Sequence, residues 1–123
     1  ARAETISEKP SFSGLIKSKR CIVLADGYYE WTHALGGSRP YYIHDPKYRI
    51  IPFAGLWDEW SGGKNKIQTC TIITTESCSD LHHIHNRMPV ILQNNDINKW
   101  IDPQHKIVDI LKMNILHQIL KFI

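Results

Sequence analysis

A glutamate set among aromatic residues is the most suggestive chemical feature of the sequence. Glu30 lies in the run Tyr28-Tyr29-Glu30-Trp31, which we expect to be a strand with Tyr28 and Glu30 on one face and Tyr29 and Trp31 on the other. A carboxyl group among aromatic rings is partly desolvated, and desolvation suits it to general acid-base catalysis. From the pattern alone, an exposed strand glutamate is the simpler interpretation.

A histidine beside an arginine is the second candidate. His85 lies in Ile84-His85-Asn86-Arg87-Met88-Pro89, where Pro89 restricts Met88 to extended geometry and predicts an ordered loop. An imidazole next to a guanidinium group suits proton transfer beside an anion. A loop histidine without a role explains the same pattern.

Metal ions, cofactors and thiol chemistry receive little support. His82, His83 and His85 cluster, but no cysteine or acidic residue stands at a recognised ligand spacing, so we expect no metal and no cofactor. The three cysteines share no CxxC spacing and lie in or beside expected strands, where a thiol packs as a small hydrophobe. They are Cys21, Cys70 and Cys78.

Residues suited to nucleic acid are scattered along the chain. Arginine and threonine side chains contact phosphates, and tryptophan rings stack on bases, a combination typical of single-strand recognition. Each candidate alone is weak, because strand aromatics usually pack in a core. The candidates are Arg2, Arg87, Thr74 or Thr75 for phosphates and Trp31, Trp57 or Trp60 for bases.

These residues are carried by a sequence that predicts several strands and few helices. Without alternating strands and helices, the pattern indicates one α+β domain over residues 1–123, with a mainly antiparallel twisted sheet or partial barrel and a few flanking helices. We expect one short helix within residues 1–20 and a hairpin loop at 34–39. Strands are expected at 21–25, 28–31, 41–43, 50–56, 69–75 and 90–92, and helices at 77–83, 95–101 and 107–122.

The composition is that of an ordinary globular protein. The 123 residues are 42% hydrophobic and 22% charged, and the formal charge of +3 permits a polyanionic partner without requiring one. No apolar run approaches the roughly 20 residues of a membrane span, and the first residues lack the apolar stretch of a secretory signal. We expect no membrane association and a reducing, cytoplasmic location near the nucleoid.

Seven short blocks occur together in an order that resembles the SRAP family, the SOS response-associated peptidases or abasic-site processing proteins. They cover roughly residues 1–101, and the Glu-Trp and His-x-Arg-Met-Pro elements are the most specific. The blocks are Ala1-Arg2-Ala3-Glu4-Thr5, Arg20-Cys21, Gly27-Tyr28-Tyr29-Glu30-Trp31, Pro40-Tyr41-Tyr42-Ile43, Ala54-Gly55-Leu56-Trp57, Thr71-Ile72-Ile73-Thr74-Thr75 and His85-Asn86-Arg87-Met88-Pro89.

The resemblance implies recognition of an abasic site in single-stranded DNA and covalent capture of its sugar aldehyde. In the family, a cysteine exposed by removal of the initiator methionine forms a Schiff base through its amine and a thiazolidine through its thiol. Glu30 would handle protons at that amine and help release the methionine, and His85 would protonate the sugar oxygen. Arg2, Thr74 and Arg87 would hold phosphates, and Trp31 would wall the pocket.

Two departures from the family pattern bear on activity. The Met-Cys-Gly start and the asparagine before Ala1 are not in this sequence, and residues after Ile101 do not continue into the family's closing strand. We therefore expect impaired crosslinking and autoprocessing. The alternatives are a noncovalent single-stranded DNA-binding protein, or a thiol protease that uses Cys21 or Cys78 with His85.

Overall fold

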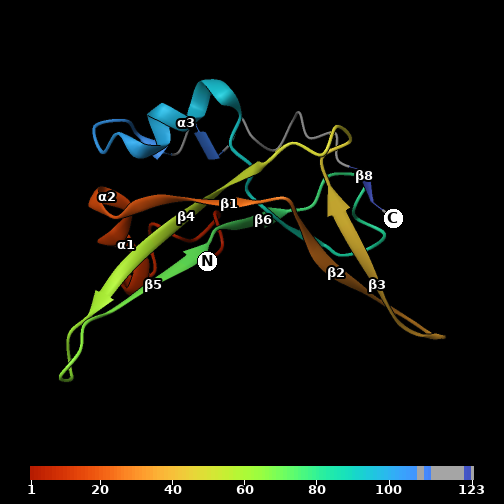
Figure 1. Ribbon diagram of the computed structural model, residues 1–123, viewed down its shortest axis with the longest axis horizontal. Coiled ribbons are helices and arrows are strands. Elements are labelled where there is room, and N and C mark those ends of the chain that lie inside the picture. The colour runs from red at the N-terminus through yellow and green to blue at the C-terminus, as the bar shows by residue number, and fades with distance from the viewer. Residues whose placement is uncertain (108–109, 112–120, 123) are drawn as a thin grey trace.

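The computed structural model describes residues 1–107, 110–111 and 121–122 (Figure 1). Two four-residue helices, α1 (Pro10–Ser13) and α2 (Leu15–Ser18), confirm the short helix expected near the start of the chain. Strands β1 (Arg20–Ala25), β2 (Gly27–Ala34), β3 (Gly37–His44), β4 (Ile51–Trp60), β5 (Ile67–Ile72), β6 (Thr74–Glu76) and β7 (Arg87–Pro89) follow, then α3 (Asn94–Ile101) and β8 (Lys121–Phe122).

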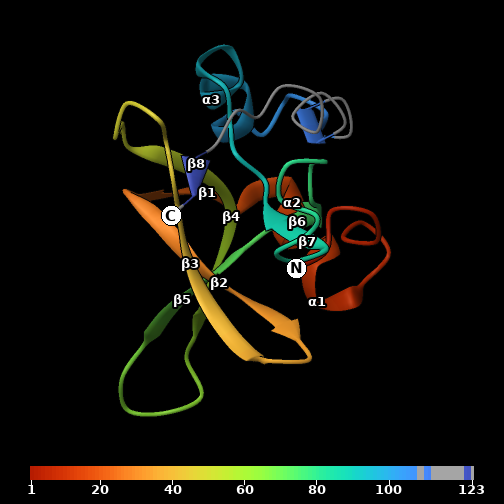
Figure 2. The ribbon, with the colours of Figure 1, turned by 90° about the vertical axis from the view of Figure 1, so that its right-hand side faces the viewer.

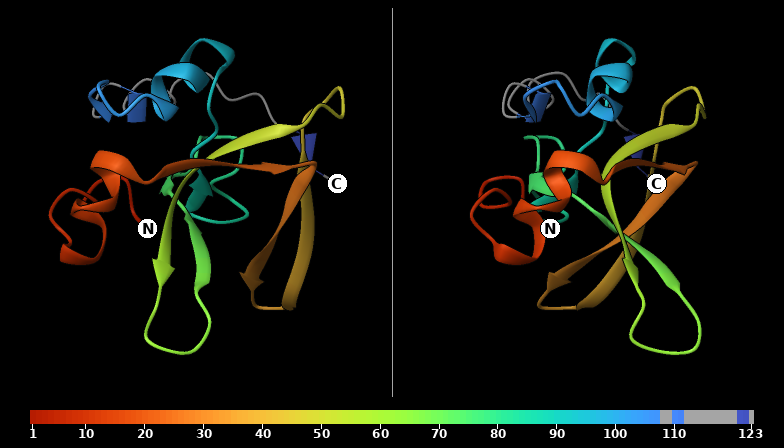
Figure 3. Two further views of the ribbon diagram at one scale, coloured as in Figure 1. Left: turned by 60° about the vertical axis from the view of Figure 1, so that its left-hand side comes forward. Right: turned by 90° about the vertical axis from the view of Figure 1, so that its left-hand side faces the viewer.

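The strands form three small antiparallel sheets, in the orders β1-β4-β5, β2-β3-β8 and β6-β7. The α+β class and the mainly antiparallel pairing are therefore confirmed, and the described strands do not close a barrel. Figures 1 and 3 show the β2-β3 and β4-β5 hairpins as separate arms that extend away from the level of β1. None of the described helices is long and apolar enough to cross a membrane.

The turn between β2 and β3 is tighter than the sequence suggested. Pairing continues to Ala34 opposite Gly37, so only Leu35 and Gly36 form the turn, and the expected loop at 34–39 is wrong in length. Gly37 has a φ of +104°, a conformation that glycine adopts without a steric penalty. The short turn fixes the register of the whole hairpin.

Three other expected elements differ from the structure. The strand expected at 69–75 is interrupted at Ile73, whose amide still donates to the Ala54 carbonyl in register with β4 (2.9 Å) but whose carbonyl accepts from the Val90 amide (2.9 Å). Residues 77–83 form turns rather than a helix, because their hydrogen bonds start afresh at Cys78 and Leu81. Residues 90–92 do not form the expected strand. They meet β4 through separate hydrogen bonds and one bridge, Phe53 to Ile91, and the strand nearest to them, β7, ends at Pro89.

The C-terminal helix expected at 107–122 is only partly open to comparison. Ile107, Ile110 and Leu111 are helical and buried, whereas residues 108–109 and 112–120 lie outside the described part of the chain. Lys121 and Phe122 pair with β3, so the helix does not reach Phe122. Helix α3 confirms the helix expected at 95–101.

Two hydrophobic clusters hold these elements together. The larger one joins β4, α3 and the N-terminal segment, and its centre is the fully buried Trp100, whose indole N–H donates to the Cys21 carbonyl at 2.9 Å. The smaller one lies under the β2-β3 hairpin and anchors the 77–86 turns. Its buried members are Ile43, Leu81, Ile84 and Met88, with Tyr28, Tyr41, Cys78 and Ile91 packed against them.

Candidate functional site

Glu30 lies on the face of β2 that turns toward the smaller cluster. Two positions earlier on the same face, the ring of Tyr28 meets that of Phe53 edge to face at 5.8 Å. Burial, and then the charge of Glu30, raise the pKa of the Tyr28 phenol, so this hydroxyl stays protonated. The Glu30 side chain is 26% exposed, which leaves its carboxylate partly open to solvent.

His85 reaches the same place from the 77–86 turns. Its neighbour Ile84 is buried in the smaller cluster and fixes the backbone there. Nδ1 of His85 lies 3.1 Å from the amide nitrogen of Arg87 and 3.3 Å from its carbonyl oxygen, and in the tautomer that accepts from the amide the proton is on Nε2. Nε2 is the nitrogen that faces Glu30, and the side chain is 34% exposed.

The two candidate catalytic residues therefore face one another. Oε1 of Glu30 and Nε2 of His85 are 3.9 Å apart, beyond hydrogen-bond length but within ion-pair range. A proton acceptor and a proton donor at this separation can act on two atoms of one small group placed beside them. The structure thus brings together two residues that are 55 positions apart (85 minus 30) in the sequence.

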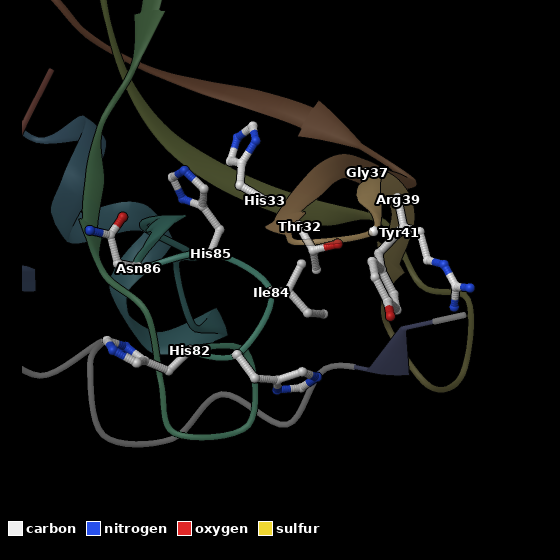
Figure 4. Close-up of a pocket in the computed structure, with 11 residues that line it drawn as sticks. Thr32, His33, Gly37, Arg39, Tyr41, His82, Ile84, His85 and Asn86 are labelled. Atoms are coloured by element: carbon white, nitrogen blue, oxygen red, sulfur yellow. The ribbon is translucent and has the colours of Figure 1, made fainter.

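An open pocket of about 640 Å³ lies beside His85. Figure 4 shows His33 and His85 on one side of it and Arg39 and Tyr41, from β3, on another. Sequence reasoning missed this wall, because the register that pairs Glu30 with Tyr41 and Thr32 with Arg39 was unknown. The full lining is Thr32, His33, Gly36, Gly37, Arg39, Tyr41, His82, His83, Ile84, His85 and Asn86.

The three residues proposed for phosphates also meet. Arg2 and Thr74 form a parallel backbone bridge. Its two hydrogen bonds run from the Thr74 amide to the Ala1 carbonyl (2.7 Å) and from the Ala3 amide to the Thr74 carbonyl (2.8 Å). Arg87 Nη2 donates to the Thr74 carbonyl at 2.8 Å and to its Oγ1 at 3.2 Å. Figure 2 shows β6 and β7 beside the N-terminus, where Arg2 is exposed.

Glu4 is a site residue that sequence reasoning left without a role. Both of its carboxylate oxygens accept hydrogen bonds from Arg87, each at 2.9 Å, and Oε1 also lies 3.4 Å from the Thr75 hydroxyl. The bond from Arg87 is the main reason that the pKa of Glu4 falls to about 2. Glu4 therefore fixes the guanidinium plane of Arg87 and neutralises its charge.

Comparison with known proteins decides the family. The model of the SOS response associated peptidase (SRAP) family matches residues 1–121, nearly the whole chain. The chain belongs to the SRAP family. The match extends beyond residue 101, where the motif resemblance ended.

Two curated relatives are both named abasic site processing proteins. The abasic site processing protein YoqW of Bacillus subtilis is 42% identical over 114 residues, which cover 91% of this chain and 51% of that protein. The abasic site processing protein HMCES of Gallus gallus is 38% identical over 123 aligned positions, covering 82% of this chain and 37% of that protein. The chain spans about half the length, or less, of these relatives.

Solved structures show the same SRAP fold. A crystal structure of a Bacteroides thetaiotaomicron protein superimposes with a TM-score of 0.89 at 35% identity, covering 99% of this chain and 56% of that one. A phage-related protein from Bordetella bronchiseptica gives a TM-score of 0.79 at 28% identity, covering 100% of this chain and 61% of that one.

Trp31 does not line the pocket of this SRAP-family chain. It lies on the face of β2 opposite to Glu30, as the strand alternation predicted, and its ring meets that of Tyr29 at 6.3 Å. Its side chain is 46% exposed. Any contact between Trp31 and a ligand of the Glu30-His85 site therefore requires the ligand to pass the edge of β2.

The thiol-protease alternative gains no support from the cysteines. Burial, and then the neighbouring Cys70, raise the pKa of the Cys21 thiol, which disfavours the nucleophilic thiolate. Cys78 packs against the smaller hydrophobic cluster. Among the residues that the structure describes, no three histidine, cysteine or acidic side chains gather in a metal-binding arrangement.

Proposed function

We propose that this protein recognises abasic sites in single-stranded DNA and that Glu30 and His85 transfer protons at the exposed sugar. The observation that carries the proposal is the 3.9 Å approach of Glu30 Oε1 and His85 Nε2. Membership of a family whose relatives are named abasic site processing proteins supplies the substrate class.

The chemistry follows from the protonation of the pair. An abasic sugar becomes reactive when its ring opens to the C1′ aldehyde: the bond from C1′ to the ring oxygen breaks, the ring oxygen gains a proton, and the C1′ hydroxyl loses one as it becomes the carbonyl. His85 would donate the proton of Nε2 to that ring oxygen, in the tautomer whose Nδ1 accepts from the Arg87 amide. Glu30 would accept a proton from an attacking amine at C1′.

Covalent capture belongs to the same proposal at the level of the family. The amine of the family's terminal cysteine condenses with the aldehyde with loss of water, and its thiol then adds to the C=N carbon to close a thiazolidine. Autoprocessing by peptide hydrolysis would free that amine. In both steps the part assigned to this chain is the proton transfer by Glu30 and His85.

Arg2, Thr74 and Arg87 would hold the phosphates beside the lesion. Arg2 is exposed, and Thr74 lies within reach of the Arg87 guanidinium. Because Glu4 occupies two donors of Arg87, a phosphate must share or replace this carboxylate. The proposal places the protein in the cytoplasm near the nucleoid, where its substrate would arise.

The test is the ratio of affinities for abasic and intact single-stranded DNA. Fluorescence anisotropy with matched oligonucleotides should show tighter binding to the abasic strand. We expect His85→Ala and Glu30→Gln to reduce that preference about tenfold or more. Glu59→Gln is the matched control, since Glu59 is a carboxylate on β4 paired with Lys66 at 3.0 Å.

Equal affinity of the unmodified protein for both strands, with a steep dependence on salt, would instead identify a noncovalent single-strand binder that does not recognise the lesion. Equal loss of preference in the Glu59→Gln control would remove the assignment to Glu30 and His85.

A further inference from the structure

A ladder of neighbouring aromatic rings, tilted at the Trp31 end and stacked at the Tyr48 end, runs along the face of the β2-β3 hairpin opposite to Glu30. Tyr29 and Tyr42 are directly paired across the two strands, and their ring centroids are 5.1 Å apart. Trp31 continues the ladder on one side at 6.3 Å. His44 at 5.6 Å from Tyr42, and Tyr48 at 4.5 Å from His44, continue it on the other.

Three of the five rings are more exposed than packing in a hydrophobic core would leave them. Trp31, Tyr29 and Tyr48 are 46%, 62% and 71% exposed, whereas Tyr42 is half-buried and His44 is buried. Three large rings are therefore presented to solvent and backed by two that are not. Flat exposed rings that are held from behind are suited to stacking on other flat rings.

The backbone is shaped to hold the ladder in place. A β-carbon at Gly27 would lie 2.5 Å from Cζ of Tyr42, so only glycine leaves room for that ring. Tyr48 has a φ of +54°, which is unfavourable for a residue with a side chain, yet its ring lies parallel to that of His44 within 13°. Such strain persists only where the surrounding structure holds it.

Lys47 and Arg49 supply two cations beside Tyr48, although Asp45 compensates the charge of Arg49. Asp45 fixes the turn by accepting hydrogen bonds from the amides of Lys47 and Arg49, and it binds the Arg49 side chain through both oxygens. This arrangement aims an exposed guanidinium next to Tyr48, with the exposed Lys47 beside it. At the middle of the ladder, burial and then the charge of the neighbouring Asp26 raise the pKa of the Tyr42 phenol, so that ring stays uncharged.

We propose that the ladder of Trp31, Tyr29, Tyr42, His44 and Tyr48 is a stacking surface for undamaged bases of single-stranded DNA. Base stacking on exposed aromatic rings tolerates any sequence, and nearby cations hold the backbone phosphates. The choice of DNA as the occupant rests on the proposed function. The ladder is a separate surface, since it lies across β2 from Glu30 and binds nucleotides outside the lesion.

The test measures binding of fluorescein-labelled oligothymidylate of about 20 nucleotides, which contains no abasic site. Tyr29→Ala and Tyr48→Gly should each weaken binding about tenfold, equivalent to about 1.4 kcal/mol. Glycine suits the positive φ of Tyr48, so this variant removes the ring without straining the backbone. Tyr29→Phe keeps a ring and should bind like the unmodified protein.

Leu35→Ala is the second control, because Leu35 is an exposed apolar residue at the tip of the same hairpin. Unchanged affinity in Tyr29→Ala and Tyr48→Gly would overturn the proposal, as would an equal loss in Leu35→Ala. Loss of self-association in these variants, with DNA binding unchanged, would also overturn it and identify a protein interface.

The same variants separate this inference from the proposed function. They should lower affinity for abasic and intact strands by the same factor and leave the ratio between them unchanged. If the unmodified protein binds abasic and intact strands equally, only the proposed function is wrong. If Tyr48→Gly changes the ratio of the two affinities, the ladder is not separate from the lesion site.

Discussion

Glu4 and Arg87, 83 positions apart in the sequence, are joined by two hydrogen bonds of 2.9 Å each. The pair links the N-terminal segment to β7 and lies directly beside Thr74. It holds one of the three proposed phosphate ligands in a fixed plane before any DNA arrives. Such an arrangement reduces the rotational freedom that binding would otherwise have to remove.

Acid should weaken the protein through Glu4. Its pKa is about 2 in the folded protein, below the ordinary value of 4.5, so its stabilising effect is complete above about pH 4.5 and is lost as the pH falls toward 2. The side chain is 48% exposed, so solvent screening limits the contribution to about 1 kcal/mol. Urea unfolding of Glu4→Gln should therefore show a deficit at pH 7 that disappears near pH 2.

Glu8→Gln is the control for that experiment, since Glu8 is an exposed carboxylate of the same segment. A deficit in Glu4→Gln that persists unchanged at pH 2, or one of equal size in Glu8→Gln, would contradict the assignment.

Arg2 should contribute to DNA binding through charge alone. Replacing it by alanine removes one phosphate contact, which for single strands lowers the slope of log affinity against log salt by about 0.7. The measurement is a salt titration of oligothymidylate binding. Lys64→Ala, in the exposed turn between β4 and β5, should leave the slope unchanged. Identical slopes for Arg2→Ala and the unmodified protein would exclude Arg2 from the phosphate path.

Gly27→Ala should destabilise the fold and displace the aromatic ladder. The added β-carbon would lie 2.5 Å from Cζ of Tyr42 and 2.7 Å from the Ile43 carbonyl, and backbone moves less readily than a side chain. We expect a loss of about 1–3 kcal/mol in the free energy of unfolding. Gly14→Ala is matched to it, because its β-carbon meets nothing within 4 Å in helical backbone, and should be neutral or slightly stabilising.

Trp100 should be the costliest single residue of the larger cluster to remove. It is fully buried, donates to the Cys21 carbonyl and lies under the guanidinium of Arg20 at 5.7 Å. Trp100→Ala should cost about 3–5 kcal/mol in chemical denaturation. Its neighbour Ile101 is 48% exposed, and Ile101→Ala should cost less than 1 kcal/mol. Similar losses in both variants would show that α3 is not anchored through Trp100.

Local sequence patterns correctly predicted the features that depend on residues close together in the chain. The alternation in Tyr28-Tyr29-Glu30-Trp31 placed Glu30 and Trp31 on opposite faces, and the structure confirms it. The strand at 69–75 failed at Ile73 because the Ile73 carbonyl accepts from the Val90 amide and the Ala54 amide donates to the Val90 carbonyl, so Ile73 and Ala54 exchange only one of the two ladder bonds. Propensity carries no information about such long-range partners.

The candidate site likewise combines residues that sequence motifs identified with residues that only the long-range pairing of strands brings together. Motif resemblance selected Glu30 and His85, and the structure places them 3.9 Å apart, while their catalytic roles stay a prediction. Arg39 and Tyr41 were missed because cross-strand register places them beside the pocket, and register depends on the length of the turn at Leu35 and Gly36. Glu4 was left without a role because its partner Arg87 is distant in sequence.

The most direct test of the Glu30-His85 pair is a double-mutant cycle on the rate of crosslinking to an abasic strand. The protein would carry the family's N-terminal segment, which starts with Met-Cys-Gly, ahead of Ala1, and denaturing gels would follow the heat-stable adduct. If the two residues act together on one sugar, Glu30→Gln combined with His85→Ala should be scarcely slower than the slower single variant. Rate losses that multiply fully in the double variant would contradict joint action.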